Sequence, residues 1–293
     1  MPDNRVEKGF RFSAAMETML PMQNSMFDLS GQVALVTGSA RGLGKNMLLA
    51  LAEHGANAVV VDLNLEHAKQ TAAEIGELGR KAIAVECDVS NVDQLRSLYK
   101  RIDDEFGRID FVGNVAGAAP LGKPEDLTLD QVEAAWRSLV YGRFCSCQEA
   151  GRRMIQQGKG SIVNIGSLAS VTAMGRGHIA YSMAMGGVAQ MTRELSTEWA
   201  SRGVRVNCIL PAQTLNPGLE ARMEADPRLR DRFLSGLPVG RFGDPNDIRG
   251  LSVFLASDAA SFITGALIPM DGGNLAMNAG GSVGTEVFKP VGG

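Results

Sequence analysis

The chain has 293 residues, of which 45% are hydrophobic and 21% charged, so it can bury a sizeable core in one large α/β domain or two smaller ones. We expect one fold. Its formal net charge of -3 and its scattered lysines and arginines give no general attraction to nucleic acid. No run of about 18 apolar residues occurs, which excludes a membrane-spanning helix.

Two features bear on metal binding and on the redox compartment. The chain has three histidines, and its cysteines form no CxxC pair, so no spacing is typical of a zinc site and we expect no bound metal. Free cysteines commonly pack as small hydrophobic residues in a reducing compartment. We therefore predict buried thiols and a cytoplasmic location, with a redox role as the alternative. The cysteines are Cys87, Cys145, Cys147 and Cys208.

Composition divides the chain into three parts. Residues 1–29 carry methionines among polar residues, without the apolar core or small-residue cleavage site of a signal peptide. They are predicted to be an arm that is either disordered or packed on a neighbouring subunit. Residues 30–274 are predicted to form the domain. Residues 275–293 form a glycine-rich tail, either mobile or an oligomer contact.

The first predicted strand, 33–36, leads through a glycine-rich turn into a predicted helix that begins near residue 44. Glycine lets the backbone turn tightly and approach a pyrophosphate, while N–H groups at the helix start point at the anion. The second strand, 58–61, ends in Asp62, where a carboxylate can accept hydrogen bonds from an adenosine ribose. This order predicts a dinucleotide site that includes Gly38, Ser39, Arg41, Gly42, Leu43, Gly44 and Asp62.

Strands and helices alternate through the rest of the chain. Gly79 is a suitable helix stop, Ser90 or Asn91 can cap a helix, and Asp244 before Pro245 can cap another. Further strands are predicted at 82–85, 109–112, 161–165, 204–209 and 266–269, and helices at 65–78, 92–106, 129–154, 179–201 and 248–256. Continuous apolar strands separated by helices predict a doubly wound, parallel, seven-stranded α/β sheet of the Rossmann type in a single domain.

These ordered motifs resemble those of the short-chain dehydrogenases/reductases over about residues 27–273. The resemblance rests on the glycine turn, on the segment 114–117 as a form of the family's N-N-A-G segment, and on Ser167 and Tyr181 as the catalytic serine and tyrosine. Segments 27–31, 240–243 and 271–273 are similar to those of gluconate 5-dehydrogenases and polyol dehydrogenases. The resemblance implies further cofactor contacts at Asp88, Val89, Asn114, Ala116, Gly117, Tyr181 and Pro211.

The implied chemistry needs a base. Moving a hydride from a carbinol carbon to nicotinamide leaves a proton on oxygen that some group must take. A free tyrosine has a pKa of about 10, so acting near pH 7 requires roughly 4 kcal/mol of stabilisation of the phenolate. The family supplies much of this from a lysine four residues after the tyrosine, which also holds the nicotinamide ribose.

Here the position of that lysine is Met185, which has neither charge nor donor. The family's relay asparagine corresponds to Leu139, its usual Pro-Gly to Pro211–Ala212, and a common threonine to Asn216. Three explanations stay open: an enzyme that uses another cation, a laboratory variant, or a family member without redox activity. Candidate cations are Arg176 and His178, with solvated loop residues as the simpler interpretation.

We therefore predict an oxidoreductase that interconverts a secondary alcohol and a ketone, with NAD(H) preferred over NADP(H) because Asp62 would repel a 2′-phosphate. Arg41 is a counter-signal, since it could meet that phosphate. The alternative is a cofactor-binding protein with impaired catalysis. Segments 168–178 and 213–237, the second long enough for a mobile lid, would select the substrate. The resemblance also implies a homotetramer, supported by a helix face with Trp136, Leu139, Val140 and Phe144.

Overall fold

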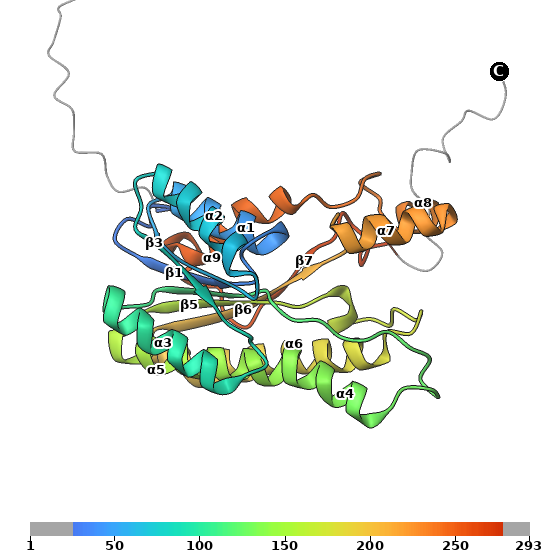
Figure 1. The fold of residues 1–293 in the computed structure, drawn as a ribbon, viewed down its shortest axis with the longest axis horizontal. Coiled ribbons are helices and arrows are strands. Elements are labelled where there is room, and N and C mark those ends of the chain that lie inside the picture. The colour runs from blue at the N-terminus through green and yellow to red at the C-terminus, as the bar shows by residue number, and fades with distance from the viewer. Residues whose placement is uncertain (1–25, 278–293) are drawn as a thin grey trace, which may run out of the picture.

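Parallel strands form one sheet in the computed structural model, which describes residues 26–277 (Figure 1). The strands are β1 (Val33–Thr37), β2 (Asn57–Asp62), β3 (Ala82–Glu86), β4 (Phe111–Asn114), β5 (Gly160–Ile165), β6 (Val204–Pro211) and β7 (Leu267–Met270). Their order is β3-β2-β1-β4-β5-β6-β7, and every neighbouring pair is parallel. The strand order reverses between β1 and β4, and ligands of such sheets bind outside the carboxyl ends at this switch point.

Helices cover both faces of the sheet (Figure 1). On one face lie α1 (Gly42–Glu53), α2 (Leu65–Glu77) and α9 (Arg249–Ala256). On the other lie α3 (Val92–Phe106), α4 (Leu129–Trp136), α5 (Gly142–Gln157) and α6 (Ile179–Trp199). The pair α7 (Pro217–Ala225) and α8 (Pro227–Leu234) lies beyond the carboxyl end of β6. Shorter turns are η1 (Arg137–Tyr141), η2 (Leu168–Ser170), η3 (Ala200–Arg202), η4 (Pro245–Ile248) and η5 (Asp258–Ala260).

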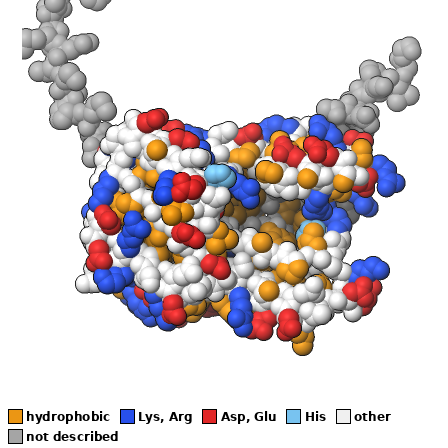
Figure 2. All heavy atoms as spheres, viewed as in Figure 1, with side chains coloured by type: hydrophobic (Ala, Val, Ile, Leu, Met, Phe, Trp, Pro, Cys, Tyr) orange, Lys and Arg blue, Asp and Glu red, His pale blue; other side chains and the backbone are white. Residues whose placement is uncertain are grey.

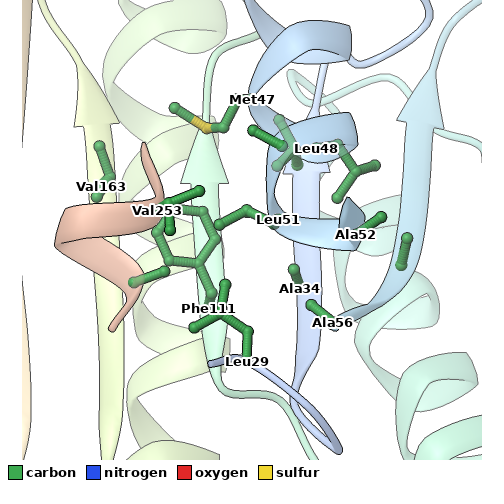
Figure 3. Packing of buried hydrophobic residues seen from close by; sticks show 14 of the residues in the cluster. Leu29, Ala34, Met47, Leu48, Leu51, Ala52, Ala56, Phe111, Val163 and Val253 are labelled. Atoms are coloured by element: carbon green, nitrogen blue, oxygen red, sulfur yellow. The ribbon is translucent and has the colours of Figure 1, made fainter. Parts of the chain in front are cut away.

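Each face of the sheet has its own apolar core. All residues of β1 are buried, because a parallel strand covered on both sides has no solvent face. Under α1 and α9, Leu51, Phe111 and Val253 belong to one cluster, joined by Leu29 from before β1 (Figure 3). The cluster under α3 and α5 is built from the alternate residues of the same strands. Packing in these two cores holds the carboxyl ends of the strands in fixed positions.

The predicted fold class is confirmed, and the predicted strands match the observed ones to within a few residues. The fourth begins at Phe111 rather than 109, because Asp110 turns its carboxylate to the Val33 N–H and to Arg108. The predicted helix 129–154 is broken by the π-helical turn η1. The segment 213–237 contains α7 and α8, which pack on a small apolar cluster that includes Leu219 and Phe233. The predicted arm and tail lie almost entirely outside the described residues.

All cysteine side chains are free and buried, as predicted. Burial raises the pKa of the Cys87 thiol to about 11 and that of the Cys147 thiol to about 12, so neither is a thiolate near neutral pH. Within residues 26–277, no group of three or more His, Cys, Asp or Glu side chains is placed to hold a metal. None of the helices in this range has the length and apolar character that a bilayer crossing requires.

Candidate active site

The turn between β1 and α1 presents backbone N–H groups at a helix start. Arg41 is the N-cap residue of α1, and no side chain caps this helix. Gly38 and Gly42 have φ angles of 69° and 57°, a left-handed region that glycine adopts without strain. Uncapped amides at a helix N-terminus attract anions. The turn therefore suits a pyrophosphate.

Helix α1 packs so closely on this turn that position 44 requires glycine. A Cβ on Gly44 would lie 2.2 Å from the carbonyl oxygen of Gly38. That separation is far shorter than a van der Waals contact, so any side chain would push α1 away from the turn. Close helix packing of this kind is what the third glycine of a dinucleotide fingerprint provides.

Asp62 stands half-buried at the carboxyl end of β2, beside the turn. Its Oδ2 accepts a hydrogen bond from the Ala40 N–H at 3.1 Å, and its Oδ1 accepts one from the Asn64 N–H at 3.1 Å. A carboxylate has about four acceptor positions, so capacity remains for a ribose diol. The Ser39 hydroxyl accepts from the Val61 N–H at 3.0 Å and so ties the turn to β2.

The ends of β1 and β4 are joined at the switch point. The Thr37 hydroxyl accepts hydrogen bonds from the N–H groups of Val115 and Ala116, at 3.1 and 3.2 Å. Gly117 follows with φ 132°, and a Cβ there would lie 2.6 Å from Cδ2 of Leu139. The small residues after β4 therefore leave room for a ligand on one side and for Leu139 on the other.

The side chain of Asn114 is used inside the protein. It is 1% exposed, and its Nδ2 donates to Oδ1 of Asn164 at 3.0 Å. Asn164 in turn donates to the Thr192 hydroxyl at 3.0 Å, which links β4 and β5 to α6. The Oδ1 atom of Asn114 has no hydrogen-bond partner among the described residues.

Asp88 and Val89 lie between β3 and α3. Asp88 Oδ1 accepts from both the N–H and the hydroxyl of Ser90, each at 2.8 Å. Asn91, rather than Ser90, caps α3 through its side chain. A Cβ on Gly142 would lie 2.1 Å from the carbonyl oxygen of Val89, so α5 starts in direct contact with this loop.

Ser167 and Tyr181 line a single cleft of about 630 Å³, together with Leu43 from the glycine turn and Pro211 from the end of β6. Figure 2 shows the hollow in this face, between the α7–α8 pair and the layer that contains α6. The structure thus brings the predicted serine and tyrosine to the same cavity as the predicted cofactor turn.

Local structure fixes both side chains. Ser167 lies two residues after the end of β5 and caps the turn η2, where its Oγ accepts from the Ala169 N–H at 3.2 Å. Tyr181 lies in the first turn of α6, and its ring meets that of His178 edge-on, with 6.2 Å between centroids. Both are therefore held at the ends of rigid elements at the carboxyl edge of the sheet.

The cleft is basic. Arg176, His178 and Arg222 contribute to its lining, whereas no Asp or Glu of the described chain does. The Arg176 guanidinium lies 4.7 Å from the centroid of the Phe233 ring, which holds it beside α8. The two candidate cations named from the sequence, Arg176 and His178, therefore do reach the cleft that contains Tyr181.

Comparisons with known proteins identify the family. A family profile described as enoyl-(acyl carrier protein) reductase matches residues 38–274, which include the glycine turn and the cleft. D-threitol dehydrogenase of Mycolicibacterium smegmatis is 40% identical over 247 residues, covering 84% of this chain and 94% of the relative. The chain belongs to the short-chain dehydrogenase/reductase family.

Two further members of the short-chain dehydrogenase/reductase family show the breadth of the similarity. NAD-dependent glycerol dehydrogenase of Listeria innocua is 35% identical, covering 84% of this chain and 95% of the relative. The crystal structure of a gluconate 5-dehydrogenase from Burkholderia cenocepacia, in complex with NADP and tartrate, has a TM-score of 0.82 at 30% identity. That comparison covers 87% of this chain and 99% of the other. The similarity to gluconate and polyol dehydrogenases expected from the motifs is confirmed.

In this short-chain dehydrogenase/reductase, Met185 and Leu139 lie in the interior next to Tyr181 and are not among the residues that line the cleft. Met185 lies one helical turn after Tyr181 and is 1% exposed, as is Leu139. Both belong to an apolar cluster that includes Ala184 and against which Tyr181 packs. Leu139, predicted on a partly exposed apolar helix face, is instead buried, because it packs from the π-helical turn η1 against Ala184 and Met185 of α6.

Sequence reasoning did not single out Arg143, which the structure places against Leu139 and Met185. The side chain is 4% exposed and contacts Sδ of Met185 at 4.0 Å. A signal was present in the sequence, since Arg143 falls four residues after Leu139 and four before Cys147, on the apolar face of the helix. Charged residues are rarely buried in a core, so an arginine at this position is a signal for a functional residue.

Proposed function

We propose that this protein is an NAD(P)(H)-dependent oxidoreductase that interconverts a secondary alcohol and a ketone. Tyr181 acts as the acid/base, and Ser167 orients the substrate oxygen by hydrogen bonding. The observation that carries this proposal is the shared cleft, in which Leu43 of the glycine turn, Ser167 and Tyr181 face one cavity. The dehydrogenase relatives support the same reaction class.

The residues of the turn fit a nicotinamide dinucleotide. The start of α1 is uncapped, position 44 requires glycine, and Asp62 presents a carboxylate at the neighbouring strand end. When bound, the nicotinamide accepts or supplies the hydride. Gly38, Ser39, Arg41, Gly42, Leu43 and Gly44 would hold the pyrophosphate. Asp88 would lie near the adenine, and Val89, Asn114, Ala116, Gly117 and Pro211 would supply further cofactor contacts along the strand ends.

Side chains of this protein carry out the proton transfer. In alcohol oxidation, the substrate O–H proton passes to the Tyr181 oxygen as the carbinol hydrogen leaves as hydride. In ketone reduction, the Tyr181 O–H returns that proton to the oxygen of the new alcohol. The Ser167 hydroxyl, at the end of β5, holds the reacting oxygen within reach of Tyr181.

NAD(H) is the proposed cofactor in preference to NADP(H). The Asp62 carboxylate would accept from the two ribose hydroxyls and would repel a 2′-phosphate. The exposed Arg41 acts in the opposite direction, since its guanidinium could pair with that phosphate. The carboxylate decides the preference because it is held in place by backbone N–H groups.

Met185 favours a second candidate function, a cofactor-binding protein with impaired redox catalysis. The thioether stands where the family pattern has its lysine, and Leu139 stands where it has an asparagine. Neither side chain can donate a hydrogen bond or carry a charge. Binding of a dinucleotide without turnover would identify this candidate.

Titration with NADH followed by turnover assays distinguishes the two functions. The panel contains secondary alcohols, ketones, polyols and sugar acids. The proposal predicts turnover that falls by a factor on the order of 10²–10⁴ in Tyr181→Phe, while NADH still binds. NADH binding with no turnover on any member of the panel would favour the second candidate, and failure to bind NADH would contradict both.

A further inference from the structure

Arg143 places a positive charge in the protein interior, against Met185, and no carboxylate of the described residues pairs with it. The side chain is 4% exposed, and none of the ion pairs within residues 26–277 includes it. A guanidinium stays protonated in proteins. Burying such a cation is costly unless a negative charge compensates it. The interior around Met185 therefore holds a positive charge that no ion pair of the described chain compensates.

Carbonyl oxygens hold this guanidinium in place but do not neutralise it. Nη2 donates to the carbonyl oxygens of Val115 and Ala116, each at 3.2 Å, and Nη1 donates to that of Leu139 at 3.3 Å. Nε has no partner. The loop after β4 and the π-helical turn η1 thus fix the orientation of Arg143 from two sides.

The charge contacts the residue that lies one helical turn after the proposed acid/base. Arg143 Nη1 contacts Sδ of Met185 at 4.0 Å, and Met185 follows Tyr181 by one turn of α6. Burial lowers the pKa of the Arg143 guanidinium, and negative charge at Tyr181 acts on it in the opposite direction. Apolar side chains pack around Met185 and against Tyr181, and charges act on each other more strongly in such surroundings than in water.

We infer that Arg143 supplies from α5 the positive charge that the family pattern places at position 185, and that it favours the ionised form of Tyr181. It acts through Tyr181 and is therefore a positioning residue. The inference rests on the proposed function, in which Tyr181 exchanges a proton with the substrate. Met185 is then the neutral neighbour that leaves room for the guanidinium.

The other titratable groups near the pair do not replace this charge. Arg176 and Arg222 are exposed, so solvent and salt screen them. Burial raises the pKa of Cys147 to about 12 and that of Cys208 to about 11, so both stay neutral thiols. No carboxylate of the described residues lines the cleft. Arg176, His178 and Arg222 share the cleft with Tyr181, and Cys147 and Cys208 act on Arg143 from the interior.

Ultraviolet titration of the phenol in the full chain tests the inference, with Tyr181→Phe subtracted to isolate the signal of Tyr181. Arg143→Met is expected to move the midpoint of phenol ionisation up by at least about one pH unit, a tenfold change in the equilibrium. Arg143→Lys is expected to recover most of that shift. An unchanged midpoint in folded Arg143→Met would overturn the inference.

A double variant provides the test if Arg143→Met does not fold. Arg143→Met combined with Met185→Lys returns a cation from the other helix and is expected to ionise near the wild-type midpoint. If Arg143→Met does not fold, this double variant carries the test, and ionisation no easier than in free tyrosine would overturn the inference. Arg205→Met is the control, because Arg205 bonds to the carbonyls of Leu255 and Ser257 at the opposite end of β6.

Turnover provides an independent readout. In Arg143→Met, the pH profile of kcat for alcohol oxidation should move to higher pH, with about a tenfold loss near neutrality and a smaller loss of ketone reduction. The phenol titration needs no substrate, so it tests Arg143 even if no turnover is found. Turnover in the wild type with an unchanged profile in Arg143→Met would contradict the inference and leave the proposed function standing.

Discussion

The carboxylate of Asp62 has two tasks that can be separated. One is structural, since Oδ2 accepts from the Ala40 N–H and so holds the glycine turn against β2. The other is the proposed selection of NAD(H) by charge. An amide oxygen can perform the first task but not the second.

Asp62→Asn is therefore expected to keep the turn and to lose the discrimination against NADP(H). Dissociation constants for NADH and NADPH, measured by fluorescence titration, should become similar. Asp62→Ala should lose the same preference and, in addition, about 1 kcal/mol of unfolding free energy, because the Ala40 N–H loses its acceptor. Comparable constants for both cofactors in the wild type would contradict the assignment of Asp62.

At the residue scale, Ser167 and Tyr181 could be proposed from the sequence. One follows a predicted strand and the other lies near the start of a predicted helix, and the order of these elements can be read along the chain. Arg143 was missed for a physical reason. Its importance lies in contacts with Val115 and Met185, which are far away in sequence. The sequence motif shows that position 185 is not lysine. It does not show that a residue of α5 places a guanidinium beside that position.

Among the elements, α1 depends most directly on one residue. Because a Cβ on Gly44 would lie 2.2 Å from the Gly38 carbonyl oxygen, the helix and the turn share this space. Overpacking of this kind typically costs about 1–3 kcal/mol. The amides at the start of α1 would also move away from the pyrophosphate.

Gly44→Ala should therefore lower both thermal stability and NADH affinity. Gly76→Ala is the matched control, because Gly76 lies in α2 with open space around its Cβ position. The control should be neutral or slightly more stable, since alanine favours a helix by about 1 kcal/mol over glycine. Equal melting temperatures and NADH affinities for Gly44→Ala and the wild type would contradict the proposed packing role.

Strands and helices with long apolar stretches could be predicted from the sequence, whereas the short, charged helices could not. The parallel strands are buried on both faces, so they read as continuous apolar stretches. Helices α7 and α8 are short and begin with proline; α7 has almost no apolar periodicity, and α8 is amphipathic but only 8 residues long. The π-helical turn η1 has no sequence signature of its own, and it interrupts a helix that was predicted to be continuous.

For the whole molecule, apolar side chains left exposed on the α4–α5 side suggest where subunits associate. Tyr141 and Phe144 are 52% and 46% exposed, and the Trp136 ring packs against Tyr141 with 6.4 Å between centroids. Leu139 is not part of this surface, contrary to the sequence prediction. Exposed aromatic clusters of this kind commonly mark protein interfaces.

We expect a homotetramer in solution, with a mass about four times that of the 31.1 kDa chain by light scattering. Phe144→Asp should lower that mass by placing a charge in the interface. Leu78→Asp, at the end of α2 in the other helix layer, should leave it unchanged. A monomeric mass for the wild type at micromolar concentration would refute the prediction.

The contact between Arg143 and Met185 also bears on how such sites diverge and are recognised. An ammonium at position 185 would share one pocket with the guanidinium and no carboxylate, so the two positions are coupled. A stepwise path between this chain and a lysine-bearing relative therefore crosses an intermediate with two cations or with none. When a family member lacks the motif lysine, the motif alone does not tell an active enzyme from an inactive one. The folded structure should then be searched for a cation that another helix brings close to the tyrosine.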